Sequence, residues 1–172
     1  MPEADRHRSE WRTGLFFIIA AFVVAIDQIT KLWVRAHLDL NEIVPVAGCL
    51  SLTYVRNTGS AFGLFADQAF LLTLIAVVGL VAVLLFYRYL SQATTLGCSA
   101  LGLVFGGAVG NLIDRFRFGY VIDFIDVRLW RDFHWPAFNV ADSAITVGTI
   151  ALVAFIFGAL GRRDATSSST GS

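Results

Sequence analysis

Charged residues are scarce in this chain, and neither sign is in excess. Asp, Glu, Lys and Arg make up 15% of the 172 residues, with 13 basic and 13 acidic side chains, whereas ordinary soluble domains carry about a quarter. The zero net charge, and the lack of any basic cluster larger than Arg162 and Arg163, argue against a nucleic-acid partner. Charge therefore gives no reason to expect a nucleic-acid-binding protein.

Cysteine and histidine are equally scarce, which removes the common signals of a metal site. The two cysteines, Cys49 and Cys98, are too few for a disulfide framework and lack metal-ligand spacing. The three histidines, His7, His37 and His134, form no HExxH motif. We therefore expect neither a metal ion nor a cofactor.

Apolar residues are abundant: they make up 56% of the chain and gather in long runs. Ala69 to Tyr87 contains no charge and no proline, and about 18 or more such residues can cross a bilayer as a helix. We read the first run as a retained helix, because further spans follow it. The predicted fold is a mainly α, four-transmembrane-helix bundle that forms one membrane domain over residues 1–172, with spans at about 11–33, 69–89, 96–113 and 140–160.

Four crossings place both termini on one side of the membrane and two long loops, at about 35–68 and 114–139, on the other. Ser51–Val55 alternates with period two, which predicts a strand and a small antiparallel sheet in the first loop. The second loop is rich in aromatics, which favour the headgroup level, and we expect a loop or helix there. The polar tail 162–172 is predicted to be disordered. Arginines divide equally between the two sides, so they do not fix the orientation.

Glycines in the third span recur every four residues on one helix face. Gly102, Gly106 and Gly110 form this stripe, with Gly107 beside it. Small residues at this spacing let two helices approach closely. The stripe predicts tight helix packing.

Polar residues within the apolar spans are costly and therefore informative. Asp27 and Lys31 lie on one face of the first span, either as an ion pair that snorkels to the interface or as a pair that positions a substrate or loop. Asn111 is expected to make an interhelical hydrogen bond. Asp114 and Arg115 follow it and could mark a helix end. Taken alone, none of these residues is a catalytic signal.

Asp123 and Asp142 form the stronger pair. Asp123 lies within the apolar stretch Tyr120–Ile125, where a lone carboxylate has little structural reason to occur. Asp142 lies at the start of the fourth span, and if Asn139 caps that helix, the carboxylate falls at its third position, where the helix dipole favours it. Asp142 could therefore also be a plain capping-box residue. The competing Asp126 is expected to be solvated.

Two neighbouring carboxylates cannot easily both ionise, so one keeps a proton while the other is charged. The charged member can accept a proton from water while the protonated member donates to a carbonyl oxygen. This pattern predicts peptide hydrolysis without a metal or a covalent nucleophile.

Read together, five segments resemble the lipoprotein signal peptidase (signal peptidase II) family over nearly the whole chain. They occur in the family's order among the four predicted spans. The segments are Asp27-Gln28-Ile29-Thr30-Lys31, Asn57-Thr58-Gly59-Ser60-Ala61-Phe62, Gly106-Gly107-Ala108-Val109-Gly110-Asn111-Leu112-Ile113-Asp114-Arg115, Val121-Ile122-Asp123-Phe124 and Phe138-Asn139-Val140-Ala141-Asp142-Ser143-Ala144.

The resemblance implies an aspartic endopeptidase of the bacterial inner membrane that cleaves prolipoproteins before a diacylglyceryl-modified cysteine. It places the catalytic dyad at Asp123 and Asp142, near the periplasmic face, with both termini cytoplasmic and the sheet periplasmic. It also implies sensitivity to globomycin-type inhibitors, contact with membrane lipid and, by default, a monomer. The substrate-binding or supporting residues that it implies are Asp27, Lys31, Asn57, Gly107, Asn111, Arg115, Asn139 and Ala141.

Two details of this site are hypotheses. Asp142 is assigned as the more frequent base and Asp123 as the acid, because the helix end favours the Asp142 carboxylate. The segment Asn57–Phe62 could close over the site and exclude bulk water.

Two other functions fit parts of the pattern. An ion-coupled transporter also uses intramembrane aspartates, but the two aspartates lie at span ends and the halves show no repeat. A serine protease with Lys31 as base would need Ser51, Ser60 or Ser143 to meet that lysine, and none lies in a nucleophile motif.

Overall fold

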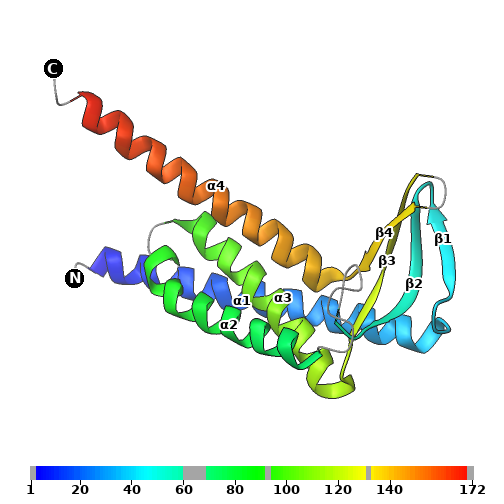
Figure 1. Ribbon diagram of the computed structural model, residues 1–172. Helices are drawn as coiled ribbons and strands as arrows, with labels where there is room; N and C mark the ends of the chain where they lie inside the picture. The colour runs from blue at the N-terminus through cyan, green and yellow to red at the C-terminus, as the bar shows by residue number, and fades with distance from the viewer. Residues whose placement is uncertain (1–2, 60–68, 92–93, 131–132, 170–172) are drawn as a thin grey trace.

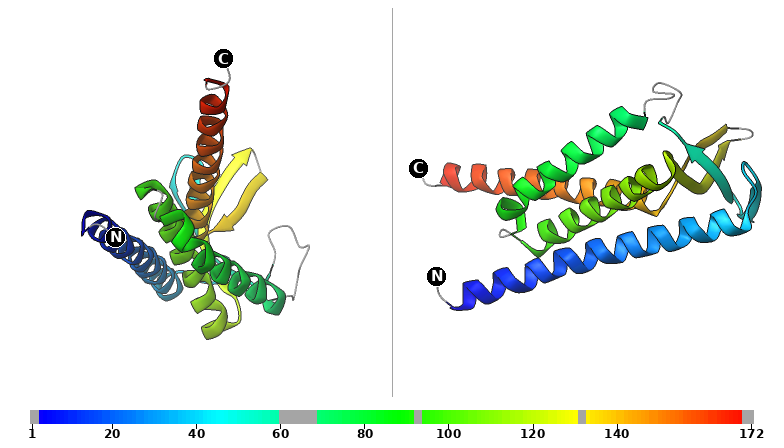
Figure 2. Two further views of the ribbon diagram at one scale, coloured as in Figure 1. Left: turned by 90° about the vertical axis from the view of Figure 1, so that its left-hand side faces the viewer. Right: turned by 90° about the horizontal axis from the view of Figure 1, so that it is seen from below.

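The computed structural model describes residues 3–59, 69–91, 94–130 and 133–169. Its helices lie along one another, and a small sheet covers one end of them, opposite the end at which both termini lie (Figures 1 and 2). The elements in chain order are α1 (Glu3–His37), β1 (Ile43–Ala47), β2 (Leu50–Asn57), α2 (Ala69–Ser91), α3 (Thr95–Phe118), β3 (Val121–Trp130), β4 (Phe133–Phe138) and α4 (Val140–Ser169).

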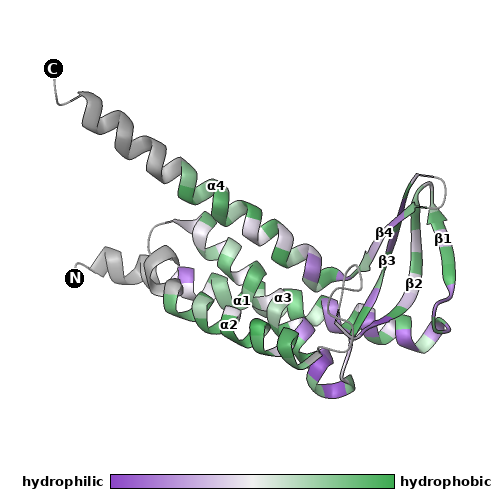
Figure 3. Ribbon diagram, viewed as in Figure 1, coloured by the Kyte–Doolittle hydropathy of each residue, from purple (hydrophilic) through white to green (hydrophobic). Residues whose placement is uncertain are grey.

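The helices have the length and apolarity of a membrane protein. Within the described residues, three segments are long and apolar enough to cross a bilayer, namely Glu10–His37, Thr95–Phe118 and Val140–Phe157. α2 contributes a shorter apolar stretch, Phe70–Leu85, so the count of four spans stays a prediction. Figure 3 shows apolar residues along the helices and more polar ones toward the sheet. Large apolar side chains such as Phe22, Phe70 and Phe157 are exposed on the helices, as expected of surfaces that face lipid.

The glycine stripe of α3 packs against α1, as predicted. A Cβ added to Gly102 would lie 3.0 Å from the Phe16 carbonyl oxygen, and one added to Gly106 would lie 2.7 Å from the Ala20 carbonyl oxygen. These neighbours are backbone atoms of another helix, so they cannot move aside easily. The absence of side chains is what lets the two helices approach this closely.

The four strands form one antiparallel sheet in the order β1-β2-β3-β4. The predicted strand in the first long loop is confirmed by β2. The expectation of a loop or helix over 114–139 is wrong, because α3 continues to Phe118 and the rest of the segment forms β3 and β4. In β3, Ile122 and Phe124 are buried with Tyr54 and with Val34 of α1. This apolar contact fixes the sheet on the end of α1.

α4 also differs from the sequence-based expectation. The helix continues to Ser169, into the segment 162–172 for which the sequence predicts disorder. Residues 170–172 lie outside the described residues. Residues 162–169 contain neither proline nor glycine, the residues that most strongly end a helix. The polar composition of residues 162–169 therefore does not end α4.

The close contact at Gly106 predicts that adding one methyl group will destabilise the bundle. Gly106→Ala should lower the unfolding free energy by about 1–3 kcal/mol, because the new Cβ would overlap the α1 backbone. Gly79→Ala in α2 is a matched control, because a Cβ there meets nothing within 4 Å. Thermal unfolding in detergent should show a lower midpoint for Gly106→Ala alone. Equal midpoints for both variants would contradict this packing.

Candidate active site

Asp123 is held inside the protein by two amide groups. It lies on β3 and is only 1% exposed. Asn57 Nδ2 donates to Asp123 Oδ2 at 2.8 Å, and Asn139 Nδ2 donates to Asp123 Oδ1 at 2.7 Å. One donor comes from the end of β2 and the other from the residue before α4. Both oxygens of this buried carboxylate are therefore fixed in place.

Asp142 lies in the first turn of α4 and forms a reciprocal cap with Asn139. The Asp142 backbone N–H donates to Asn139 Oδ1 at 2.9 Å, and the Asn139 N–H donates to Asp142 Oδ2 at 3.3 Å. The predicted cap is therefore confirmed, and Asp142 is a capping-box residue. Its other oxygen, Oδ1, accepts a bond of 2.7 Å from Asn111 Nδ2. Capping fixes this carboxylate at the edge of the site.

The two asparagines join the aspartates into one network. Asn139 contacts both carboxylates, and its Nδ2 also donates to Asn111 Oδ1 at 3.1 Å. Asn111 thus makes the interhelical hydrogen bonds that the sequence predicted. Asp123 and Asp142 are connected through amide side chains from α3 and from the start of α4.

The environment of Asp123 favours its protonated form. Burial, and to a smaller extent the nearby Asp142 charge, raise the pKa of this carboxyl to about 7. The hydrogen bonds from Asn57 and Asn139 and the charge of Lys31 oppose this rise. A carboxyl group that titrates near neutral pH can both hold and release a proton there.

Lys31 lies at the centre of a second, fully buried cluster. Its Nζ contacts Asp27 Oδ2 at 2.8 Å, Asp114 Oδ2 at 3.0 Å and Asn111 Oδ1 at 2.9 Å. Lys31 is 1% exposed and Asp27 is 0% exposed, so the snorkelling alternative is wrong. Three acceptors use the three hydrogens of an ammonium group. Lys31 therefore contacts two carboxylates and one amide, and none of its contacts among the described residues is with a serine.

Asp27 and Asp114 each accept a backbone N–H from a segment that carries Asp142 or Asp123. Asp27 Oδ1 accepts from Ala141 N at 2.9 Å, and Asp114 Oδ2 accepts from Ile122 N at 3.0 Å. Asp114 was predicted only to mark a helix end, yet it is fully buried within α3. Its spacing from Asn111 on one face of a helix was the signal that could have identified it.

Gly107 and Ala141 are small because α3 and α4 touch here. A Cβ on Gly107 would overlap the Ala141 carbonyl group, and Ala141 itself is 0% exposed. Arg115 is half-buried, and the charges of Asp142, Asp123 and Asp114 act on it. Of the eight predicted supporting residues, Asn57, Asn111 and Asn139 bond directly to the two aspartates. Asp27 and Gly107 contact Ala141, the residue before Asp142, and Lys31 contacts Asn111.

Asp126 is not the solvated residue that the sequence suggested. It is 6% exposed, and both of its oxygens lie 2.8 Å from His134 Nδ1 on β4. The pairing of β3 with β4 brings this histidine beside it. The expectation was wrong because the second loop was not recognised as a strand pair.

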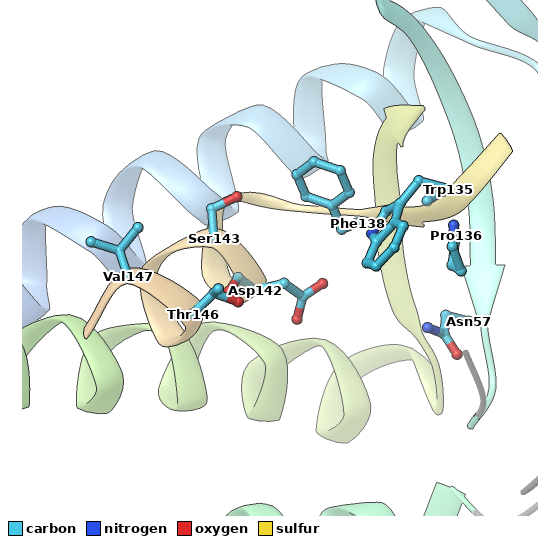
Figure 4. A pocket seen from close by; sticks show the side chains of 9 residues that line it. Asn57, Trp135, Pro136, Phe138, Asp142, Ser143, Thr146 and Val147 are labelled. Atoms are coloured by element: carbon cyan, nitrogen blue, oxygen red, sulfur yellow. Dashed lines mark hydrogen bonds between the residues drawn. The ribbon is translucent and has the colours of Figure 1, made fainter. Parts of the chain in front are cut away.

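A mainly apolar pocket of about 570 Å³ opens beside Asp142. Figure 4 shows the Asp142 carboxylate pointing into this space toward Asn57, with Trp135 and Phe138 forming its other walls. The pocket lies between the end of β4 and the first turns of α4. Its lining residues are Asn57, Trp135, Pro136, Ala137, Phe138, Asp142, Ser143, Thr146 and Val147.

The proposed cover of the site is described in part. Asn57 Oδ1 accepts the Gly59 N–H at 3.1 Å, which forms a local turn after β2. Ser60, Ala61 and Phe62 lie outside the described residues, so closure of this segment stays a prediction. Across the described parts of the chain, no three His, Cys, Asp or Glu side chains are grouped as metal ligands would be.

The apolar helices, with the buried Asp123 and the half-buried Asp142 near the sheet end, define a membrane-embedded hydrolase of the aspartic type as the class that fits. A family description for "Signal peptidase (SPase) II" matches residues 19–158. The chain belongs to this signal peptidase II family and is an aspartic-type signal peptidase.

Relatives and solved structures agree with this assignment. The lipoprotein signal peptidase of Syntrophotalea carbinolica is 49% identical over 78% of this chain and 85% of its own. That of Moorella thermoacetica is 46% identical over 80% of this chain and 89% of its own. A bacterial membrane enzyme solved by the in meso method at 2.3 Å resolution superposes with a TM-score of 0.77 at 33% identity, covering 84% of this chain and 88% of that one.

The raised pKa of Asp123 leads to a direct prediction. In Asp142→Asn, the pKa of Asp123 should fall below about 7, because a like charge is removed. It should stay above the ordinary aspartate value, because burial is the larger cause. Carboxyl-carbon NMR of aspartate-labelled protein in micelles measures both values. Asp126→Asn is the control, and an Asp123 pKa that responds equally to both changes would contradict the assigned cause.

Proposed function

We propose that this protein is an aspartic endopeptidase that removes signal peptides from diacylglyceryl-modified prolipoproteins, cleaving before the lipidated cysteine. The observation that carries the proposal is the pair Asp123 and Asp142, joined by Asn139 and set beside a mainly apolar pocket. Membership in the signal peptidase II family supports the reaction, and the names of the relatives support the lipoprotein substrate.

In the proposed reaction, Asp142 is the base and Asp123 is the acid. The Asp142 carboxylate takes a proton from water, and the water oxygen attacks the scissile carbonyl carbon. Asp123 donates its proton to the carbonyl oxygen, which gives a neutral tetrahedral intermediate. Collapse of this intermediate breaks the C–N bond as Asp142 donates its proton to the leaving amine. Asp123 takes a proton back from one of the two hydroxyl groups, which gives the carboxylic acid and restores the dyad. A pKa near 7 supports Asp123 as the member that is protonated at neutral pH.

The amide donors are consistent with Asp142 as the base and Asp123 as the acid. Asn57 and Asn139 hold Asp123, and Asn111 holds Asp142, so neither carboxylate must reorient during the reaction. Fixed donors stabilise charge without a reorganisation cost at the moment of reaction. Arg115 adds a positive charge that acts on both carboxylates.

The substrate fits the depth and polarity of the pocket. A diacylglyceryl chain stays in the bilayer, so the adjacent peptide bond reaches the protein at the membrane surface. The pocket beside Asp142 is walled by apolar groups such as Trp135, Phe138 and Val147, which suits an apolar signal peptide or acyl chain. Globomycin-type inhibitors would compete for the same space.

We infer the topology from the same considerations. Four spans, with α2 among them, would leave both termini cytoplasmic and the sheet on the periplasmic side of the inner membrane. The supporting observation is that both termini lie at the end opposite the sheet (Figure 1). We take the enzyme to act as a monomer, with membrane lipid around α1 and α4. An ion-coupled transporter has no support from the relatives.

The proposal is tested by cleavage of a diacylglyceryl-modified prolipoprotein by purified protein in detergent with EDTA, followed by gel shift. Asp123→Asn and Asp142→Asn should each lower kcat by about 10²–10⁴-fold, because each removes a proton-transfer group. Asp126→Asn, which removes a buried carboxylate of β3 outside the dyad, should keep near-normal turnover.

Thermal unfolding of each variant establishes that it is folded before activity is compared. Inert wild-type protein with the lipidated substrate would overturn the proposed function. Near-normal turnover by either folded dyad variant would overturn the dyad while leaving the peptidase assignment in place.

A further inference from the structure

One ammonium group links the two segments that carry the dyad. Lys31 Nζ contacts the carboxylates of Asp27 at 2.8 Å and Asp114 at 3.0 Å. Asp27 accepts the N–H of Ala141, and Asp114 accepts the N–H of Ile122. Each of these N–H groups belongs to the residue immediately before a dyad aspartate. The same arrangement therefore occurs twice around a single charge.

We propose that Asp27, Lys31 and Asp114 form an ionic clamp that sets the separation of Asp123 and Asp142, and that Asp114 is a positioning residue of the enzyme. The inference rests on the proposed function of the dyad. It assigns Asp114 a part in the reaction through the β3 backbone, without contact to the substrate.

The clamp connects β3 to α4, two elements that are not joined by backbone pairing. Asp123 belongs to a strand, Asp142 belongs to a helix, and no sheet ladder joins the two. The clamp supplies the connection through α1 and α3. Its carboxylates are 0% exposed, and a buried ion pair that loses one partner leaves an uncompensated charge. The relative position of Asp123 and Asp142 is therefore maintained because separating these buried charges would cost free energy.

The clamp also has little room to shift. A Cβ added to Gly110 would lie 2.6 Å from Asp27 Oδ2, so this carboxylate rests directly on the α3 backbone. On the other side, Gln28 Nε2 donates to Asp114 Oδ1 at 2.9 Å and to the Gly110 carbonyl at 3.2 Å. Both oxygens of Asp114 are therefore engaged, and its side chain is fixed in one orientation.

Lys31 also reaches the dyad by a third route. Its contact with Asn111 Oδ1 orients that amide, so that Nδ2 points at Asp142 Oδ1. Asn111 can donate to Asp142 only while its oxygen faces the ammonium and Asn139. The clamp therefore sets the backbone before each aspartate and also one hydrogen bond to Asp142.

Two substitutions at Asp114 separate the parts of the clamp. Asp114→Leu removes the acceptor of the Ile122 N–H and the charge that faces Lys31. It should lower kcat about 100-fold, because a displacement of about 1 Å in a reacting group can cost that much. Asp114→Asn keeps one oxygen for the N–H but loses the charge, and should lower kcat about tenfold. KM should stay within about twofold in both, because Asp114 lies outside the pocket lining.

The matched control is Asp126→Asn, which removes a buried, hydrogen-bonded carboxylate from the same strand that carries Asp123. All variants are compared at a temperature below their unfolding midpoints, with kcat and KM measured separately. A drop in kcat for Asp114 variants, with normal kcat for Asp126→Asn at a similar or larger loss of stability, supports the clamp. A merely structural Asp114 would instead follow its unfolding midpoint.

Three results distinguish the possible failures. Normal kcat in folded Asp114→Asn and Asp114→Leu would overturn the clamp while wild-type cleavage upholds the proposed function. An equal drop in kcat for Asp126→Asn would also overturn it, because strand stability alone would then explain the loss. Inert wild type, or active dyad variants, would remove the dyad on which the clamp rests.

Discussion

The cost of burying charge governs the arrangement of this protein. Asp27, Asp114 and Asp123 are all essentially inaccessible to water, yet their partners differ. The first two share the Lys31 ammonium at 2.8 and 3.0 Å. The hydrogen-bond donors described for Asp123 are instead neutral amides of Asn57 and Asn139. Burial and the nearby Asp142 charge raise the pKa of Asp123 to about 7, so this carboxyl tends to keep its proton near neutral pH. The ion pairs with Lys31 therefore distinguish Asp27 and Asp114, which have a structural role, from Asp123, the candidate catalytic residue.

Small residues make these contacts possible. Gly106 lets α1 approach α3, Gly110 makes room for the Asp27 carboxylate, and Gly107 makes room for the Ala141 backbone. Without such close approach, the short Asp27 side chain would not reach the Ala141 N–H at 2.9 Å. The polar network therefore depends on the helix packing. The glycines let the helix backbones approach closely, and the buried charges then hold the helices in their relative positions.

Much of this was available from the sequence, because membrane spans and capping residues have local signals. The long apolar runs predicted the helices, period-two alternation predicted β2, and Asn139 with Asp142 predicted the start of α4. What the sequence did not predict depends on partners distant in the chain. β3 and β4 are paired strands, and Asp126 is buried because that pairing brings His134 to it. The spacing of Asp114 from Asn111 places the two on one helix face, but its role depends on Lys31 and Ile122, which belong to a different helix and a strand.

The central claim is that Asp123 and Asp142 together bind the tetrahedral intermediate of peptide hydrolysis. It is tested most directly by a crystal structure with a lipidated peptide in which a hydroxyethylene group replaces the scissile amide. The account predicts that the hydroxyl oxygen lies within hydrogen-bonding distance of both carboxylates, with the apolar part of the peptide in the pocket lined by Trp135 and Val147. A hydroxyl bound away from either aspartate, in a fully occupied complex, would contradict it.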